Sequence, residues 1–257
     1  MIEYFGRVLL DGRPHFATCV RDKVGLLTGS FLAETLPPVA TWCPLDQVKI
    51  LPPVMPRVVL AVGRNYRAHA AEFGNEVPAE PLFFLKQPGT VVADGDPVYL
   101  PSGMGRIDFE GELVVVIGRP AFRLSGPEEA QAAIFGYTIG NDITARELQK
   151  QDGQWTRAKG FETFGPIGPW IAQGLESQKL RLRTTVNQVV HQDGNTGDMI
   201  FSPADLVYRA SQFMAFKPGD LLFTGTPEGV GPVKPQDLVQ ISIDGIGTLS
   251  NLMKAQD

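Results

Sequence analysis

The stretch of sequence that decides the fold is Asp108-Phe109-Glu110-Gly111-Glu112-Leu113-Val114-Val115-Val116-Ile117-Gly118. Its second half is an unbroken apolar, β-branched run that ends at a glycine, which predicts a buried strand. Because residues two apart on a strand point to the same face, Glu110 and Glu112 would hold two carboxylates side by side. A divalent cation between them would relieve the repulsion of their like charges. Taken alone, however, such a Glu-x-Glu pattern is more often an exposed polar strand end.

Another acidic residue stands in a similar setting further along the chain. Residues 135–141 read as a strand, Asp142 ends it, and residues 143–151 read as a helix. Asp142 is either the N-cap of that helix or a third oxygen ligand at the corner between strand and helix. Arg146 and Gln149 would share a helix face with Asp142 and would suit the oxygens of a substrate carboxylate. The alternative is a solvated face on which Arg146 pairs with a neighbour.

The rest of the chain reads as many short strands and few helices. Apolar runs bounded by glycine or proline recur from Val58 to Ile243, and four helices are expected, over residues 66–73, 126–135, 143–151 and 202–216. Ser125 with Glu128 resembles a capping box for the second helix, and Ser202 followed by Pro203 is a good start for the fourth. The pattern predicts a β-rich α+β fold and not an alternation of strands and helices.

Prolines set the first fifty residues apart from the remainder. Asp11-Gly12, between two short apolar runs, is a hairpin signal. Pro37-Pro38 and Pro52-Pro53 then punctuate the chain before the first long apolar run. We predict a small N-terminal β segment over residues 1–50 and a main, catalytic domain over residues 51–257.

Composition narrows the classes of partner and metal. The formal net charge is -5 and no basic block occurs, which argues against nucleic acid or an acidic membrane; an anionic substrate would require positive charge concentrated locally. No apolar run could span a bilayer, and the start does not resemble a signal peptide, so we expect a cytoplasmic protein. Cys19 and Cys43 are expected to be reduced, with one disulfide as the alternative. With only three histidines in the chain, a metal would be held by oxygen ligands, which favours Mg²⁺, Mn²⁺ or Ca²⁺.

Six motifs, in order along the chain, match one known family. They are VGRNYRAHAAE at 62–72, FFLK at 83–86, DFEGEL at 108–113, GYTIGND at 136–142, KGFETFGPIGPW at 159–170 and TGTPEGV at 224–230. The chain from about residue 58 to 250 thus resembles the fumarylacetoacetate hydrolase family; each motif alone is weak, but the ordered set is specific. The resemblance implies a mixed β-sandwich roll, usually a homodimer. It also implies Mg²⁺ or Mn²⁺ held by Glu110, Glu112 and Asp142, and a small 2-oxo acid or β-dicarbonyl substrate.

The resemblance also assigns roles to polar residues outside this acidic triad. His69 and Glu72, three residues apart, would share a helix face, where a glutamate raises the basicity of an imidazole. Such a pair is more often a surface contact, but hydrolytic members of the family use one at these positions to activate water. Lys159 is implied to stabilise an oxyanion or enolate. Thr226 is implied to hold the substrate carboxylate by its hydroxyl or backbone.

Some assignments stay open at this level. Arg64 and Arg67 are both candidates for attracting an anionic substrate, and the sequence does not decide which faces the site. In several family members the segment around His69 closes over the ligand, and Gly74-Asn75 would suit a hinge. Three aromatic residues either line the pocket or belong to the core: Trp155, Phe161 and Phe164. His191 reads as a strand residue without a role, in a hairpin where Asn187-Gln188 replaces the Asn-Gly turn of related members, which puts the turn geometry in doubt.

The function expected first is C–C bond hydrolysis of an acylpyruvate-type substrate through a metal-bound enolate. A decarboxylase or isomerase of aromatic catabolism, of the 2-hydroxyhepta-2,4-diene-1,7-dioate isomerase type, or an oxaloacetate decarboxylase would need the same enolate, so these remain alternatives. A binding protein without activity is the alternative from another class. The retained acidic triad, with His69, Glu72 and Lys159, argues against it.

Overall fold

Gly111–Ile117 forms β11, an interior strand of a large sheet, and all of its residues are buried. Its odd-numbered residues, such as Leu113, contribute to one hydrophobic core, and its even-numbered residues, such as Val114, contribute to another. This division follows from the alternation of side chains along a strand, which places the two cores on opposite faces of the sheet. Glu112 is in phase with Val114 and therefore points to the second face.

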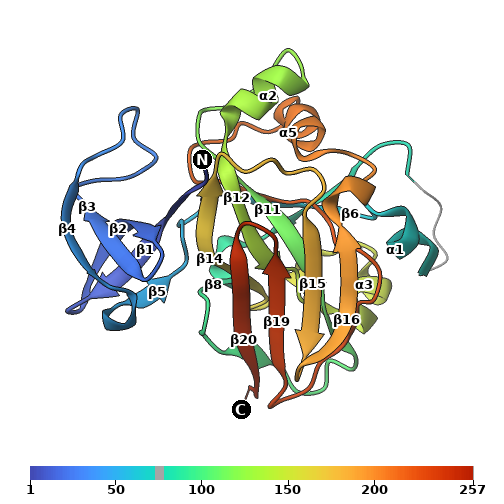
Figure 1. The fold of residues 1–257 in the computed structure, drawn as a ribbon. Helices are drawn as coiled ribbons and strands as arrows, with labels where there is room; N and C mark the ends of the chain where they lie inside the picture. Colours follow the sequence, from blue (N-terminus) through green and yellow to red (C-terminus); the bar gives the residue numbers. More distant parts are fainter. Residues whose placement is uncertain (73–77, 257) are drawn as a thin grey trace.

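The computed structural model describes residues 1–72 and 78–256 (Figure 1). The hinge predicted at Gly74-Asn75 lies outside the described residues. Within them, the large sheet has twelve strands in the order β4-β3-β2-β1-β14-β12-β11-β17-β6-β7, with β5 beside β1 and β8 beside β14. Besides β11, its strands are β1 (Glu3–Leu10), β2 (Arg13–Val20), β3 (Lys23–Leu27), β4 (Val39–Pro44), β5 (Lys49–Leu51), β6 (Val59–Gly63), β7 (Leu82–Lys86), β8 (Val91–Val92), β12 (Ile134–Asn141), β14 (Gly165–Gln173) and β17 (Leu221–Phe223).

A second sheet packs across the middle of the first (Figure 1). Its order is β16-β15-β19-β20-β9, from β9 (Val98–Leu100), β15 (Arg181–Val186), β16 (Val189–Asn195), β19 (Leu238–Ile243) and β20 (Gly247–Ala255). A short third sheet consists of β10 (Ile107–Phe109), β13 (Thr144–Ala145) and β18 (Gly231–Pro232). Leu113 of β11 and Ile241 of β19 belong to the same buried cluster, so the two larger sheets form a sandwich. The predicted β-rich α+β class is confirmed.

Helices are short and lie at the margins of the sheets (Figure 1). They are α1 (Arg67–Glu72), α2 (Pro127–Ala133), α3 (Arg146–Asp152), α4 (Thr156–Lys159) and α5 (Pro203–Ser211), with single 3₁₀ turns at Leu45–Gln47, Pro88–Thr90 and Thr196–Asp198. Ser202 caps α5 as predicted, because its Oγ accepts a hydrogen bond from the amide of Asp205 at 3.2 Å.

Several predicted helix details are wrong. The N-cap of α2 is Gly126, and Ser125 instead donates from its amide and hydroxyl to Glu129, so the capping box with Glu128 does not form. The second helix ends at Ala133 because Ile134 begins β12, and the fourth ends at Ser211, before residue 216.

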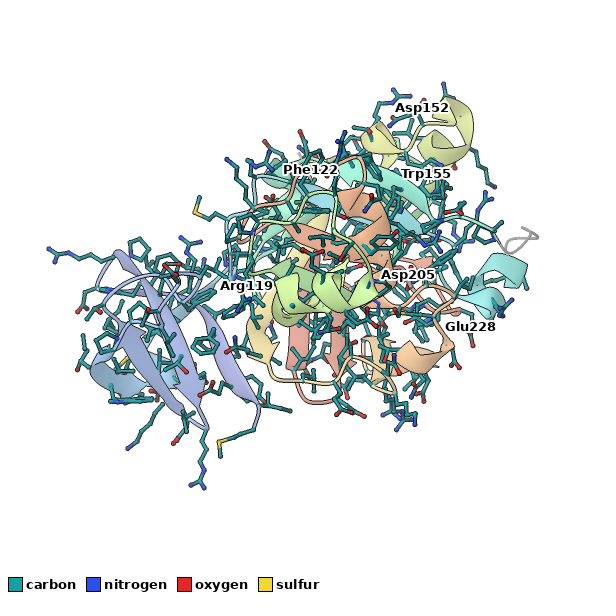
Figure 2. The ribbon with its side chains drawn as sticks, turned by 90° about the horizontal axis from the view of Figure 1, so that it is seen from above. Arg119, Phe122, Asp152, Trp155, Asp205 and Glu228 are labelled. Carbon is teal, nitrogen blue, oxygen red and sulfur yellow. The ribbon has the colours of Figure 1, made fainter. Side chains whose placement is uncertain are left out.

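The N-terminal strands stand to one side of the main body (Figure 2), yet they continue its large sheet. β1 pairs antiparallel with β14, with Tyr4 opposite Ala172. The predicted hairpin is confirmed: Asp11 and Gly12 have φ angles of 50° and 74°, as a type I′ turn requires, and join β1 to β2. The division into two domains at residue 50 stays a prediction.

Two further expectations concern the cysteines and a turn. Cys19 and Cys43 both pair with Val24, on opposite sides of β3, which puts their backbones about 10 Å apart by strand spacing. A disulfide cannot span that distance, and both thiols are free.

Asn187 and Gln188 have φ angles of 50° and 69°, so the tight turn between β15 and β16 forms even with glutamine in place of glycine. No helix in the described ranges is long and apolar enough to cross a membrane.

Candidate metal centre and active site

The start of β11 and the end of β12 meet, and this corner carries three carboxylates. Gly111 lies opposite Asn141 in the antiparallel pair. The amide of Glu110 donates to the side-chain oxygen of Asn141, and the amide of Asp142 donates to the carbonyl of Glu110, both at 2.9 Å. These bonds fix the backbone on both sides of the corner, so the acidic side chains are held and not merely close.

The three predicted metal ligands converge. One carboxylate oxygen from each of Glu110, Glu112 and Asp142 lies within 4.8 Å of the others, and all three residues are buried. The oxygens around one Mg²⁺ lie roughly 3–4 Å apart, given metal–oxygen bonds of about 2.1 Å. The N-cap interpretation of Asp142 is wrong, because the N-cap of α3 is Ala145 and residues 144–145 form β13. For the same reason Asp142 does not share a helix face with Arg146 and Gln149.

Two buried lysines contact these carboxylates. The Nζ of Lys159, at the end of α4, lies 2.9 Å from Glu110 and also pairs with Asp142. The Nζ of Lys86, the last residue of β7, lies 2.7 Å from the other oxygen of Asp142 and donates to the carbonyl of Lys159 at 2.5 Å. Sequence reasoning gave Lys86 no role; the available signal was a charged residue that ends an apolar strand, as with the acidic residues.

The pKa values of the two glutamates in the triad shift in opposite directions. Burial would raise the pKa of Glu110, but Lys159 and Arg146 outweigh it and lower that pKa to about 2. Burial, then the charges of Asp142 and Glu110, raise the pKa of Glu112 well above its ordinary value. Its Oε2 accepts a hydrogen bond from the amide of Gly225 at 2.6 Å. Glu112 is therefore the acid whose charge the protein compensates least, and a bound cation would compensate it.

The donor set fits a hard divalent cation. All three candidate ligands are carboxylates, and no histidine or cysteine belongs to the cluster found among the described residues. Mg²⁺ and Mn²⁺ prefer such oxygen ligands, whereas structural zinc prefers nitrogen and sulfur.

Arg146 lines the cavity but is engaged by protein groups. Its Nε lies 2.7 Å from Asp108, an Nη lies 2.6 Å from Glu110, and the other Nη donates to Gln149 at 3.0 Å. Arg106 also pairs with the buried Asp108 at 2.7 Å. The predicted proximity of Arg146 and Gln149 is confirmed, but the guanidinium acts first to orient Glu110. Asp108, which anchors that guanidinium, had no predicted role.

His69 and Glu72 form the predicted pair on α1. The His69 Nδ1 and a Glu72 oxygen are 3.2 Å apart, and the other Glu72 oxygen accepts from the amide of Gly229 at 3.3 Å. The carboxylate is thus held from two sides and fixes one ring nitrogen of the buried His69. The His69 side chain lines the same cavity as Glu110 and Glu112.

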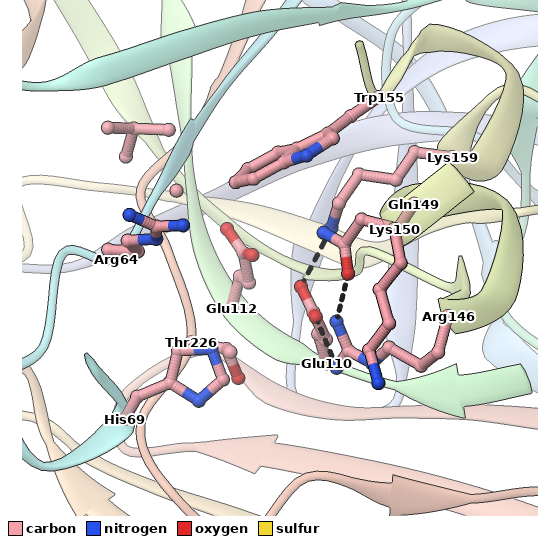
Figure 3. Close-up of a pocket in the computed structure, with 12 residues that line it drawn as sticks. Arg64, His69, Glu110, Glu112, Arg146, Gln149, Lys150, Trp155, Lys159 and Thr226 are labelled. Carbon is pink, nitrogen blue, oxygen red and sulfur yellow. Dashed lines mark hydrogen bonds and ion pairs between the residues drawn. The ribbon is translucent and has the colours of Figure 1, made fainter. Parts of the chain in front are cut away.

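This cavity has a volume of about 270 Å³, suited to a small substrate (Figure 3). Besides His69 and the two glutamates it is lined by Val62, Gly63, Arg64, Arg146, Gln149, Lys150, Trp155, Lys159 and Thr226. Arg64 therefore faces the site, whereas Arg67 is exposed and does not line it. Trp155 lines the cavity and Phe164 is fully buried in the core, with Phe161 packed beside it.

Thr226 is placed in the cavity wall, but its hydroxyl is used within the protein. It donates to the carbonyl of Gly111 and accepts from Gln192, at 2.8 and 2.7 Å. Gln192 in turn accepts from the amide of Gly111 at 3.0 Å. The predicted substrate contact of Thr226 would thus fall to its backbone. Gln192 supports the backbone of Gly111, between Glu110 and Glu112, a role that the sequence did not suggest. His191 beside it is exposed on β16, with its ring edge-on to Phe109.

The sequence profile described as fumarylacetoacetate (FAA) hydrolase C-terminal matches residues 58–254. This chain belongs to the fumarylacetoacetate hydrolase family. Protein Rv2993c of Mycobacterium tuberculosis is 46% identical over 211 residues, 81% of this chain and 79% of that protein. Oxaloacetate tautomerase YisK of Bacillus subtilis is 40% identical over 222 residues, 80% of this chain and 73% of that protein. A crystal structure of 2-hydroxyhepta-2,4-diene-1,7-dioate isomerase from Mycobacterium marinum matches with a TM-score of 0.92 and 38% identity, covering 99% of both chains.

The comparisons confirm the resemblance and the fold class, and they identify the chain as a member of a family of enzymes that includes isomerase, tautomerase and hydrolase proteins. The acidic triad is a site at which such an enzyme can hold a divalent cation.

Proposed function

We propose that the chain is a Mg²⁺- or Mn²⁺-dependent enzyme that moves a proton at the carbon next to the keto group of a small 2-oxo acid. The observation that carries the proposal is the position of His69: its ring is fixed by Glu72 and lines the same small cavity as Glu110 and Glu112. A positioned base beside a cation site is the arrangement that keto–enol chemistry requires.

Glu110, Glu112 and Asp142 would hold the cation. When bound, it supplies Lewis acidity toward the oxygens of a 2-oxo acid. The fit rests on the three buried carboxylates and on the raised pKa of Glu112, which forms no ion pair with a lysine or arginine within the described residues.

His69 takes or gives the proton, and the carboxylate of Glu72 stabilises the imidazolium that forms. Lys159 would stabilise negative charge that develops on the substrate oxygen. Burial would lower the pKa of Lys159, but Asp142 and Glu110 outweigh it and raise that pKa, so its ammonium stays charged at neutral pH. Arg64, at the cavity wall, attracts the anionic substrate.

C–C hydrolysis of an acylpyruvate is the second candidate, and it was the first expectation from the sequence. The same observation supports it, because a base in this position can deprotonate water as well as carbon. Hydrolysis needs a water molecule between His69 and a second carbonyl, whereas tautomerisation or isomerisation needs only the proton transfer. The names of the tautomerase and isomerase relatives favour the simpler reaction.

The test is a panel of substrates with Mg²⁺ or Mn²⁺, each compared with a chelated sample and an enzyme-free blank. The panel contains enol-oxaloacetate, followed as it converts to the keto form, acetylpyruvate, and a hydroxymuconate-type dienoate. We expect metal-dependent turnover of at least the first. Absence of metal-dependent turnover across the panel would overturn the proposal, and turnover of acetylpyruvate alone would select hydrolysis.

A matched pair of variants tests the base. His69→Ala should lower turnover by roughly 10²–10⁴-fold, the usual contribution of a positioned base, and leave metal affinity nearly unchanged. Arg67→Ala, an exposed change on the same helix, should leave both unchanged. Full activity in His69→Ala would show that another group moves the proton.

A further inference from the structure

A second cavity adjoins the one that contains the carboxylates. It has a volume of about 410 Å³ and is lined by Leu82, Phe83, Phe84, Gly153 and Gln154. Arg64 and Trp155 line both cavities, so the two meet at these side chains.

The indole of Trp155 lies where the two cavities meet. It projects from the connection between α3 and α4 toward the first cavity (Figure 3). A Cβ placed on Gly63, which lines the first cavity, would lie 2.5 Å from the indole, so the ring rests directly on that backbone. The ring also packs edge-on to Phe84, which lines the second cavity, with centroids 5.2 Å apart. Gly63 and Phe84 together hold the indole in one place.

The second cavity is apolar on most sides and open. Phe84 and Trp155 present aromatic surface, and Leu82 is 41% exposed on β7, the edge strand of the large sheet. No atom lies within 4 Å of a Cβ placed on Gly153. Such a space suits an aryl or bulky alkyl group, whose burial is favourable without any polar partner.

We propose that Trp155 determines specificity by restricting the substrate to a small distal group. The inference rests on the proposed function, in which the 2-oxo acid head lies at the carboxylates. With the indole in place, the head cavity of about 270 Å³ ends at the ring. Without it, the distal group of a larger 2-oxo acid extends into the apolar cavity beyond.

The test compares tautomerisation of phenylpyruvate with that of oxaloacetate in the full-length, metal-loaded enzyme. In Trp155→Ala the ratio of kcat/KM for phenylpyruvate to kcat/KM for oxaloacetate should rise by roughly 10–100-fold, the range for fitting an apolar group into a pocket. Trp155→Phe should shift the ratio in the same direction by less, which keeps the test valid if the alanine variant does not fold. Leu82→Ala enlarges the second cavity but keeps the indole, so it should leave the ratio within about threefold of wild type.

Using a ratio separates selectivity from any general loss of activity, since Trp155 also lies near Lys159, with the Nζ 5.9 Å from the ring centroid. An unchanged ratio in both Trp155 variants, or a wild-type enzyme that already prefers phenylpyruvate, would overturn the proposal.

Binding measurements distinguish this failure from failure of the proposed function. Calorimetry with Mg²⁺ should show that oxalate, a mimic of the head alone, binds wild type and Trp155→Ala alike, and that phenylpyruvate gains affinity only in the variant. If oxalate binds neither protein, the proposed function and this inference fall together. If oxalate binds both but phenylpyruvate gains nothing, the inference alone is refuted.

Discussion

Glu112→Gln distinguishes the loss of stability caused by repulsion within the acidic triad from the contribution of the triad to metal binding. The change removes a buried negative charge that lies within 4.8 Å of Asp142 and Glu110, and keeps an oxygen that can accept from the amide of Gly225. Two unit charges 4.8 Å apart repel by about 3.5 kcal/mol at an effective dielectric constant of about 20. Lys159 offsets part of this, so we expect a net gain of about 1–3 kcal/mol in the stability of the metal-free protein.

The size of this gain in stability depends on pH. Because the pKa of Glu112 is raised in the folded state, the folded protein holds a proton that the unfolded chain has lost, so stability falls as pH rises above the ordinary carboxyl pKa of about 4.3 and toward the raised pKa. The glutamine variant lacks this loss. The two proteins should therefore be about equally stable near pH 5, and the variant should be more stable at pH 8.5, by roughly 2–10 °C in Tm.

Bound metal should favour the wild type over the Glu112→Gln variant, whereas the metal-free comparison favours the variant. Saturating Mg²⁺ at about 100 times its Kd stabilises the wild type by about 2.7 kcal/mol, and the same concentration should barely move the variant, which lacks one anionic ligand. Thermal unfolding of both proteins, with and without Mg²⁺ and at both pH values, measures the pH effect and the Mg²⁺ effect on the Tm of each protein. Glu128→Gln, the same substitution at an exposed site, is the control. It should change neither the pH dependence of Tm nor the Tm shift caused by Mg²⁺. A variant that is less stable without metal but keeps the full Mg²⁺ shift would refute the reasoning.

Three other predictions follow from packing and assembly. Asp108→Asn should destabilise the fold by about 1–3 kcal/mol, measured by chemical denaturation, because the buried Arg146 loses one ionic partner and keeps Glu110. Gln188→Gly should stabilise it by about 0.5–1 kcal/mol without changing activity, because glycine adopts the positive φ of 69° at no steric cost; a loss of stability would show that the glutamine side chain matters. We also propose a homodimer: light scattering at micromolar concentration should give about twice 28.0 kDa, and the mass of one chain, unchanged by Mg²⁺ and ligand, would contradict it.

Strands that are apolar throughout were predictable because their signal is local. The run at the centre of β11 reads as a strand whatever surrounds it. The end of α2 could not be predicted in this way, because no glycine or proline separates Ala133 from Ile134. Only pairing with β11 and β14 makes Ile134 the start of a strand. Asp142 is a similar case: Thr144 and Ala145 suit a helix locally, but their pairing with β10 delays the helix by one turn and removes Asp142 from its N-terminus.

The acidic members of the site could be found from spacing, but their partners could not. Glu110 and Glu112 are predictable as neighbours because residues two apart on a strand point to the same face. Lys86 and Gln192 come to the same corner from β7 and β16, and no local sequence pattern predicts those contacts. Long-range register places them, and a single sequence does not encode register in any local pattern.

Charge balance explains how an acidic chain presents a site suited to an anion. Four buried carboxylates, of Asp108, Glu110, Glu112 and Asp142, are matched in number by four cations, of Lys86, Arg106, Arg146 and Lys159. Their formal charges sum to zero although the chain carries -5, but the ion pairs involve only Asp108, Glu110 and Asp142 among the acids. A divalent cation added to a balanced cluster leaves an excess of positive charge, which Arg64 at the cavity wall increases. A small 2-oxo carboxylate should therefore be attracted to the cavity more strongly when the cation is in place. Metal and substrate should accordingly bind with positive coupling, each tightening the other.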